Sequence, residues 1–116
     1  MPTSEIPHQW DVVVLPFPYA DRLAEKRRPA AVVSLPQMAK EHGIVWVAMI
    51  TSAANAGWAS DIGISDLAAA GLTSPSVIRP AKIATIDVSR IVHVAGHLPE
   101  SDAEALAHAL KTFTGL

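Results

Sequence analysis

Residues 44–50 form the longest unbroken apolar run of the chain, and they constrain its fold more than any other segment. The run reads Ile-Val-Trp-Val-Ala-Met-Ile and carries no polar residue on either face of an extended strand. Because a strand of a small antiparallel sheet normally exposes one face to water, this run predicts a strand that is covered on both faces. A curled barrel, a packed helix or a subunit interface would supply the second cover. Trp46 is expected in the core or in an interface.

Other segments favour strands around this run. They are rich in apolar and β-branched residues, and turn residues separate them: 11–15, 29–34, 61–64, 76–79, 82–86 and 91–96. Pro29 has no N–H to donate, so it is expected to open its strand or to lie on a sheet edge. Pro80 is expected to interrupt the strand around it. Segments 35–43 and 53–60 are expected to form a turn and a loop.

The end of the chain predicts a helix that lies on the surface of the sheet. Ser101 and Glu104 have the spacing of a capping box, and Gly115 is expected to end the helix. Residues 65–71 predict one further helical turn, with Ser65 as N-cap and a glycine past its end. The apolar residues of the last helix recur at helical spacing and form one narrow stripe: Ala103, Leu106, Leu110 and Phe113.

Together these segments predict a mainly β fold, a small, strongly bent SH3-like barrel with a C-terminal α-helix. With 116 residues the chain is expected to form one domain, 1–116. The absence of cysteine excludes disulfides, thiolate metal sites and a cysteine nucleophile. The first residues lack the basic and apolar regions of a signal peptide, and no apolar run is long enough to cross a bilayer. We therefore expect a cytoplasmic protein with no membrane partner.

The charge of the chain is small but uneven. A net charge of −2 and a pI near 6.2 argue against a nucleic-acid partner at first, because phosphate binding favours a basic surface. Residues 1–90 carry eight basic and eight acidic side chains, whereas residues 91–116 carry Lys111 against three acids. This distribution keeps a nucleic-acid partner open, because four bases crowd the segment before the second predicted strand: Arg22, Lys26, Arg27 and Arg28.

Two side chains that suit phosphate chemistry are expected to meet at one end of the sheet. If the strands on either side of the 35–43 turn pair antiparallel, Arg28 and Thr51 lie at the same end, with Ser52 beside them. A fixed guanidinium neutralises charge on phosphate oxygens, which suits a phosphodiester. The alternative is structural: Arg28 pairs with Glu25, and Thr51 closes a turn.

The remaining candidates each have two interpretations. Tyr19 and Trp58 could stack on unpaired bases or contact a binding partner, or they could pack within the protein. Lys26 and Arg27 could be solvated loop charges or contacts to phosphate. The histidines show no metal spacing supported by carboxylates, so no metal is expected, and the structural interpretation is preferred for all five: His8, His42, His93, His97 and His108.

An ordered set of segments resembles the PemK/MazF family of toxin endoribonucleases. The first three are Asp11-Val-Val-Val-Leu-Pro-Phe-Pro-Tyr19, Arg27-Arg-Pro-Ala-Ala-Val-Val-Ser34 and Ile50-Thr-Ser52. The similarity covers about residues 10–113, because it continues through three further segments and the closing helix: Ala70-Gly-Leu72, Pro75-Ser-Val-Ile-Arg79 and Lys82-Ile-Ala-Thr-Ile-Asp87.

The resemblance implies an SH3-like barrel that forms a homodimer and cleaves single-stranded RNA at short sequences without a metal or cofactor. It also implies a cognate antitoxin that inhibits the toxin by binding it. On this resemblance the catalytic arginine of the family's Arg-Pro motif maps to Arg28, and its threonine maps to Thr51. Two positions depart from the family pattern: Trp10 stands in place of a glycine, and Ala84 in place of a common arginine. The first loop also differs, so no RNA sequence preference is carried over.

Metal-free RNA cleavage most simply uses the 2′-hydroxyl of the substrate as nucleophile. A guanidinium stays protonated at any working pH, so Arg28 is expected to stabilise charge and not to act as the base. Thr51 is expected to orient the scissile phosphate, and the group that accepts the 2′-hydroxyl proton stays open.

Two other functions fit the same sequence. A barrel that binds RNA or an antitoxin but has lost activity is compatible with the alanine at position 84. A toxin of the same fold that poisons DNA gyrase is the other alternative. The gyrase poisons of this kind end in Trp-Gly-Ile, whereas this chain ends in Thr-Gly-Leu.

Overall fold

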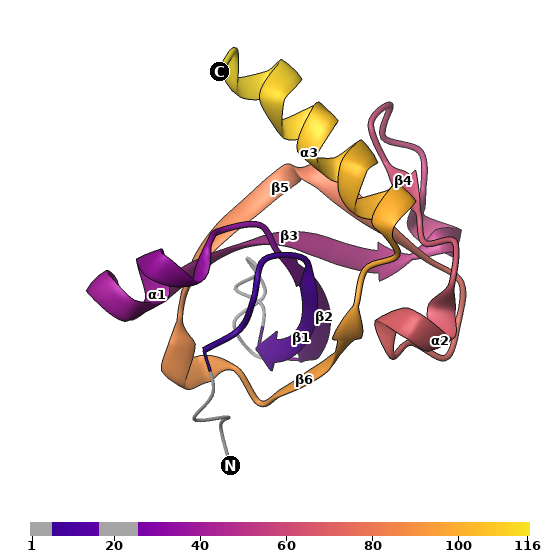
Figure 1. The fold of residues 1–116 in the computed structure, drawn as a ribbon. Helices are drawn as coiled ribbons and strands as arrows, with labels where there is room; N and C mark the ends of the chain where they lie inside the picture. The colour runs from indigo at the N-terminus through magenta and orange to yellow at the C-terminus, as the bar shows by residue number, and fades with distance from the viewer. Residues whose placement is uncertain (1–5, 17–25) are drawn as a thin grey trace.

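The computed structural model describes residues 6–16 and 26–116, and its strands form one curled antiparallel sheet (Figure 1). The order across the sheet is β4-β5-β3-β2-β1-β6. This half-barrel with a C-terminal helix confirms the predicted mainly β class. The strands are β1 (Asp11–Pro16), β2 (Arg27–Val32), β3 (Ile44–Ser52), β4 (Ile62–Gly63), β5 (Ser76–Asp87) and β6 (His93–His97). The helices are α1 (Pro36–His42), α2 (Leu67–Ala70) and α3 (Glu100–Thr114), with short 3-10 turns η1 (Ala53–Asn55) and η2 (Val88–Arg90).

β3 lies between β2 and β5 and is buried on both faces, as its apolar run predicts. One face contributes Val45 and Val47 to a core cluster inside the curled sheet, where Leu15 and Ile91 pack. The opposite face contributes to a second cluster, which α3 covers with Leu106. The curl of the sheet supplies one cover and the helices supply the other.

Trp46 is the apolar exception in β3, because its side chain is 46% exposed. The expectation of a core position is therefore wrong for Trp46, while the interface alternative stays a prediction.

Pro29 lies inside β2, two residues after its first residue Arg27. The pairing of β2 with β3 starts only at Ala30, so Pro29 has β1 alone as a neighbour and costs no second ladder bond.

Pro80 does not divide β5, which runs unbroken as a twelve-residue strand. The neighbouring residues Ala48 and Met49 of β3 pair with Ile83 and Arg79, so three residues of β5, including Pro80, have no opposite partner. Such a bulge tolerates a proline and bends the strand, which explains why one curved strand replaces the two predicted ones.

The predicted turn at 35–43 is wrong, because it contains the helix α1. Pro36 opens the helix, where its missing N–H costs nothing, and Gly43 ends it in the left-handed conformation with φ 70°. Gln37 donates to Glu41 one turn later at 2.8 Å. Proline at the start and glycine past the end were the available signals for this helix.

The predicted N-caps of α2 and α3 are also wrong. α3 begins at Glu100 after Pro99, without a side-chain cap, so Ser101 lies inside the helix and makes no capping box. α2 is capped by the side chain of Asp66 and not by Ser65. The N–H and the hydroxyl of Ser65 donate instead to the buried carboxylate of Asp102, at 2.8 and 3.1 Å. Neither helix therefore uses the serine predicted as its cap, and Ser65 makes a tertiary contact instead.

Trp10 adopts a left-handed backbone with φ 74°, the only non-glycine residue among those described to do so. Trp10 is the position at which the resemblance expects a glycine. The turn into β1 therefore keeps the conformation that favours glycine, while a bulky side chain occupies it at a cost of about 1–2 kcal/mol.

Gly71 combines a left-handed backbone with a close contact, which gives a test of the packing of α2 against β6. Its φ is 75°, and an added Cβ would lie 2.1 Å from the carbonyl oxygen of Ala95. We expect Gly71→Ala to lower the free energy of unfolding by about 2–5 kcal/mol through strain and overpacking. Gly43→Ala is the matched control, because Gly43 has a similar φ of 70° and open space around it. Urea unfolding that gives equal losses for both variants would contradict the close contact.

Candidate functional site

The start of β2 and the end of β3 form one side of a cleft of about 250 Å³. The antiparallel pairing of these strands, with Ala30 opposite Met49, brings Arg28 and Thr51 to the same end of the sheet. The geometric part of the prediction is thus confirmed: both side chains line the cleft. The other lining residues are mostly small and hydroxylated: Pro29, Ile50, Ser52, Leu72, Thr73, Ser74 and Ser76.

Arg28 is the only basic residue that lines this cleft among the residues described. It is half-buried in β2, opposite Leu15 of β1, and its Nε atom is buried. The following proline restricts Arg28 to extended backbone, which fixes the direction in which its side chain leaves the strand. Lys26 and Arg27 precede it and are exposed, outside the lining of the cleft.

Thr51 is buried, with 6% of its surface exposed, and its backbone lies in the ladder between β3 and β5. Its hydroxyl oxygen Oγ1 accepts a hydrogen bond of 3.1 Å from the side-chain amide of Asn55. Ser52 is exposed at the next position, and its hydroxyl accepts from the N–H of Ala54, which caps η1. The cleft therefore combines a threonine whose hydroxyl is held by a hydrogen bond with an arginine from the neighbouring strand.

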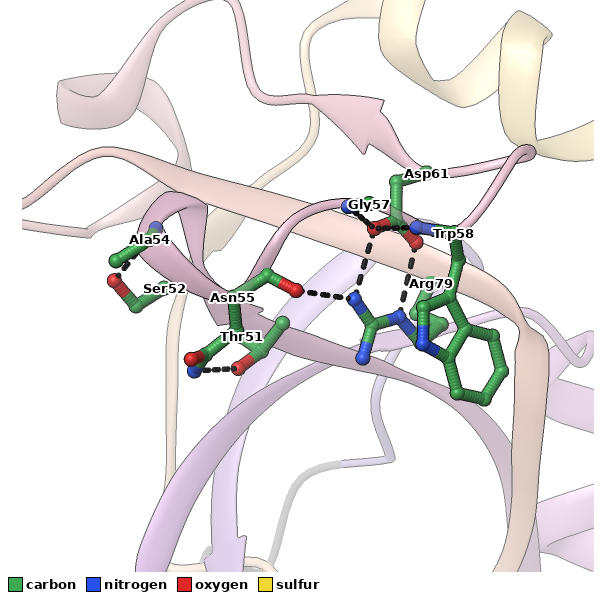
Figure 2. A network of polar contacts seen from close by, with 8 residues as sticks. All are labelled: Thr51, Ser52, Ala54, Asn55, Gly57, Trp58, Asp61 and Arg79. Carbon is green, nitrogen blue, oxygen red and sulfur yellow. Dashed lines mark hydrogen bonds and ion pairs between the residues drawn. The ribbon is translucent and has the colours of Figure 1, made fainter.

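A buried ion pair lies beside the cleft, and Figure 2 shows its contacts. Arg79 of β5 donates from Nε and Nη2 to the two carboxylate oxygens of Asp61, at 3.0 and 2.8 Å. The side chains of both residues are less than one-tenth exposed. Nη2 of Arg79 also donates to the backbone carbonyl of Asn55, at 2.9 Å.

Sequence reasoning missed Arg79, Asp61 and Asn55 as parts of the site. The available signal was an arginine within the apolar start of β5, where a buried charge requires a partner. The partner could not be identified from that signal, because Asp61 and Arg79 are 18 positions apart and belong to different elements.

Trp58 packs against the protein and is also half-exposed to solvent. Its ring lies over the guanidinium of Arg79, 4.3 Å from carbon to centroid, while 49% of its surface is exposed. This arrangement combines the two interpretations of Trp58, because a cation–π contact holds the ring and leaves it accessible. Tyr19, the other aromatic candidate, lies outside the described residues, as does Glu25, the partner in the structural alternative for Arg28.

Ala84, where the resemblance expects an arginine, packs against the core cluster inside the sheet. It does not line the cleft with Arg28 and Thr51. Among the histidines, His97 forms a 2.9 Å contact with Asp11 across the pair of β1 and β6. Within residues 6–16 and 26–116, no three histidine or carboxylate side chains gather closely enough to hold a metal ion.

A second surface feature is an apolar groove of about 530 Å³ between the last turns of α3 and the sheet. Figure 1 shows the C-terminal end of α3 projecting beyond the strands. Several of the apolar side chains in this groove are exposed, among them Trp46 at 46% and Ile83 at 42%. The apolar lining residues of this groove are Trp10, Val33, Trp46, Ile83, Ala107, Leu110 and Leu116.

The ion pair gives the segment before β4 a defined pH dependence. The hydrogen bond from Arg79 holds the pKa of Asp61 below its ordinary value of 3.8, and burial of the carboxylate opposes this shift. Because the pKa of Asp61 is lower in the folded state, its stabilising contribution is present above the unfolded pKa. It is lost as the pH falls through the folded pKa.

We therefore expect Asp61→Asn to lower the free energy of unfolding by about 3–5 kcal/mol near neutral pH, because the buried charge of Arg79 loses its partner. The difference from the wild type is expected to stay constant from about pH 8 to 5 and to shrink below about pH 4. Urea unfolding at several pH values measures it. Asp66→Asn is the control, since asparagine caps a helix as well as aspartate. A difference that persists unchanged into strong acid would refute the ion pair.

The chain matches the family model described as "PemK-like, MazF-like toxin of type II toxin-antitoxin system" over residues 8–114. No curated protein matches it. Among solved structures, MazF from Deinococcus radiodurans is 21% identical, with a TM-score of 0.77, over 97% of this chain and 100% of that one. The Mycobacterium tuberculosis toxin MazF-mt6 is 25% identical, with a TM-score of 0.72, over 91% of this chain and 97% of that one.

An endoribonuclease solved in complex with its cognate antitoxin, from a mycobacterial species, has 17% identity and a TM-score of 0.72, over 96% of this chain and 95% of that one. These structures have the fold described above, and the family model spans almost the whole sequence. The chain therefore belongs to the PemK/MazF-like family of toxins of type II toxin–antitoxin systems.

Proposed function

We propose that this toxin is an endoribonuclease that cleaves single-stranded RNA at short sequences, without a metal or cofactor. The observation that carries the proposal is the cleft in which Arg28 and Thr51 lie together at the rim of the sheet. A single cation among hydroxyl groups fits one phosphodiester group. A long duplex backbone would instead need a row of lysine and arginine side chains. The small net charge of −2 agrees with such a local site.

The 2′-hydroxyl of the substrate is the proposed nucleophile. Its oxygen loses its proton and attacks the adjacent phosphorus, and the bond to the 5′-oxygen of the next nucleotide breaks. The leaving 5′-oxygen takes up a proton, so a 2′,3′-cyclic phosphate and a 5′-hydroxyl end result. Arg28 stabilises the charge that develops on the phosphate oxygens. Thr51 donates a hydrogen bond that orients the phosphate, while Ser52, Lys26 and Arg27 contact its neighbours. Trp58 stacks on an unpaired base. The base that takes the 2′-hydroxyl proton is not assigned.

Replacement of Arg28 tests this proposal. We expect Arg28→Ala to lower the cleavage rate by about 100–1,000-fold, as for the loss of one preorganised charge stabiliser. The assay incubates a long RNA with purified protein in EDTA and sequences the new ends, which also reveals the recognition sequence. Arg90→Ala is the control, because Arg90 is an exposed arginine in η2 and lies outside the cleft.

The same assay separates the alternatives. Site-specific cuts by the wild type in EDTA support the ribonuclease, and full activity of a folded Arg28→Ala variant removes Arg28 from the site. Intact RNA together with antitoxin binding favours an inactive barrel. Inhibition of gyrase supercoiling without RNA cleavage favours a gyrase poison.

A cognate antitoxin and a second copy of the chain are the proposed protein partners, in the cytoplasm. Three of the solved structures that share the fold are complexes of MazE with MazF from Deinococcus radiodurans, which supports the antitoxin. No helix of the described residues is both long and apolar enough to span a bilayer.

The apolar groove beside α3 is where we place the second copy. A two-fold dimer buries the same patch on both copies, so one apolar groove is sufficient for it. The strained backbone of Trp10 supports this position, because Trp10 keeps a bulky ring in the groove at a conformation suited to glycine. Exposed apolar surface of this kind marks interaction sites on small proteins.

We expect Trp46→Lys to shift the protein from dimer to monomer at micromolar concentration, because it places a charge in the buried patch. Light scattering after size exclusion measures the mass. Leu35→Lys is the control: Leu35 is 59% exposed and lies outside the groove. A wild-type monomer, or an unchanged dimer in the Trp46 variant, would count against this interface.

A further inference from the structure

The chain of contacts that begins at the buried pair of Arg79 and Asp61 ends at the hydroxyl of Thr51. We infer that Arg79 is a positioning residue for the cleft, which fixes the Thr51 hydroxyl through Asn55. This inference deepens the proposed ribonuclease function and rests on it. Figure 2 shows the hydrogen bonds and the ion pair that link these four residues.

Arg79 ties together the two ends of the segment that follows β3. Its fork donates to both carboxylate oxygens of Asp61, at 3.0 and 2.8 Å, and its Nη2 also donates to the carbonyl of Asn55 at 2.9 Å. Asp61 in turn accepts from the backbone N–H groups of Gly57 and Trp58, each at 3.3 Å. One guanidinium therefore holds residues 55–61 against β5.

Asn55 carries this constraint to the cleft. Its carbonyl is held by Arg79, and its side-chain amide donates to Oγ1 of Thr51 at 3.1 Å. Because Oγ1 accepts this hydrogen bond, its own proton is directed to another acceptor. Thr51 lies in the β3–β5 ladder with 6% exposure, so rotation of the side chain is the freedom that Asn55 restricts. In the cleft, the acceptor supplied by the proposed substrate is a phosphate oxygen.

An arginine meets the geometric requirement here and a lysine does not. The contacts come from Nε and Nη2 of one planar group, which reach a carboxylate and a carbonyl together. The ring of Trp58 covers the guanidinium at 4.3 Å and shields it from water. Lysine would keep the charge but would lose the fork, so the electrostatic field at the cleft would change little while the position of Asn55 would relax.

A double-mutant cycle separates positioning of Thr51 from general support of the fold. We expect Asn55→Ala to lower kcat for a labelled RNA oligonucleotide about fivefold to tenfold, with KM within about twofold, through the loss of one hydrogen bond. In a Thr51→Val background the same change is expected to have no further effect. Arg79→Lys is expected to lower kcat about tenfold, also with little change in KM. Gln37→Ala, an exposed amide on α1 outside the cleft, is the control.

A second measurement does not depend on activity. Asn55 is the only asparagine of the chain, so selective ¹⁵N labelling yields one side-chain amide pair in an NMR spectrum. We expect this pair to shift in Thr51→Val and in Arg79→Lys, and to stay unchanged in Gln37→Ala. Asn55→Ala leaves the buried ion pair intact. The double-mutant cycle of Asn55 and Thr51 can therefore still be measured if Arg79→Lys fails to fold.

The outcomes are distinguishable. The positioning role alone is overturned by either of two results with an active wild type. One is that the Asn55 amide signals stay unchanged in Thr51→Val and Arg79→Lys. The other is that Asn55→Ala still lowers kcat in the Thr51→Val background. If the wild type cuts no RNA while the Asn55 signals still shift in both variants, the ribonuclease function is overturned. The contacts from Arg79 to Thr51 then exist but serve no RNA cleavage. The inference is supported if the Asn55 signals shift in both variants, if Asn55→Ala lowers kcat only while Thr51 is present and not in Thr51→Val, and if Gln37→Ala has no effect.

Discussion

β3 is buried on both faces, and the positions of the other elements follow from that burial. One face needs the curl of the sheet to close over it, and the other needs α3 and α2 to pack against the strands. The bulge at Pro80 bends β5 so that it can follow this curl beside β3. Both the half-barrel and the C-terminal helix thus answer one requirement, which is to remove two apolar faces of a single strand from water.

The candidate site lies at the end of the apolar run of β3. Ile50 is the last apolar residue of the run and is 1% exposed, and Thr51 follows it at the rim. The same antiparallel pairing that buries β3 brings the start of β2 to this rim, so Arg28 enters the cleft from a rigid strand. Polar groups on strand ends are held more precisely than groups on loops. Segment 53–61 departs from the strands here, and the buried pair of Arg79 and Asp61 gives it comparable rigidity.

Sequence reasoning could predict the parts of the structure that depend on local pattern or on simple pairing. The double burial of β3 and the meeting of Arg28 with Thr51 follow from an apolar run and from antiparallel geometry. The predicted cap of α3 was wrong because the helix begins already at Glu100, after Pro99, without a side-chain cap. At α2 the neighbouring Asp66 is the cap, and Ser65 instead binds Asp102 from 37 positions away, a contact that local sequence does not show. The ion pair of Arg79 was hidden for the same reason. By contrast, α1 had its proline and glycine signals and could have been identified.

The charge of the chain takes a different meaning once the contacts are known. Arg79 is neutralised inside the protein by Asp61, so it adds little to the field outside. Two of the three acids of α3, Glu100 and Glu104, line a separate hollow next to Trp10 and not the cleft. Attraction of RNA to the proposed site would then come from Arg28 and the basic side chains of Lys26 and Arg27 just before it. This attraction acts over about one Debye length, near 8 Å at physiological salt. Discrimination would depend on directed groups, such as a held hydroxyl and a held ring, because so few charges give little nonspecific affinity. A positioning network beside the cleft is the expected complement of so weak a field.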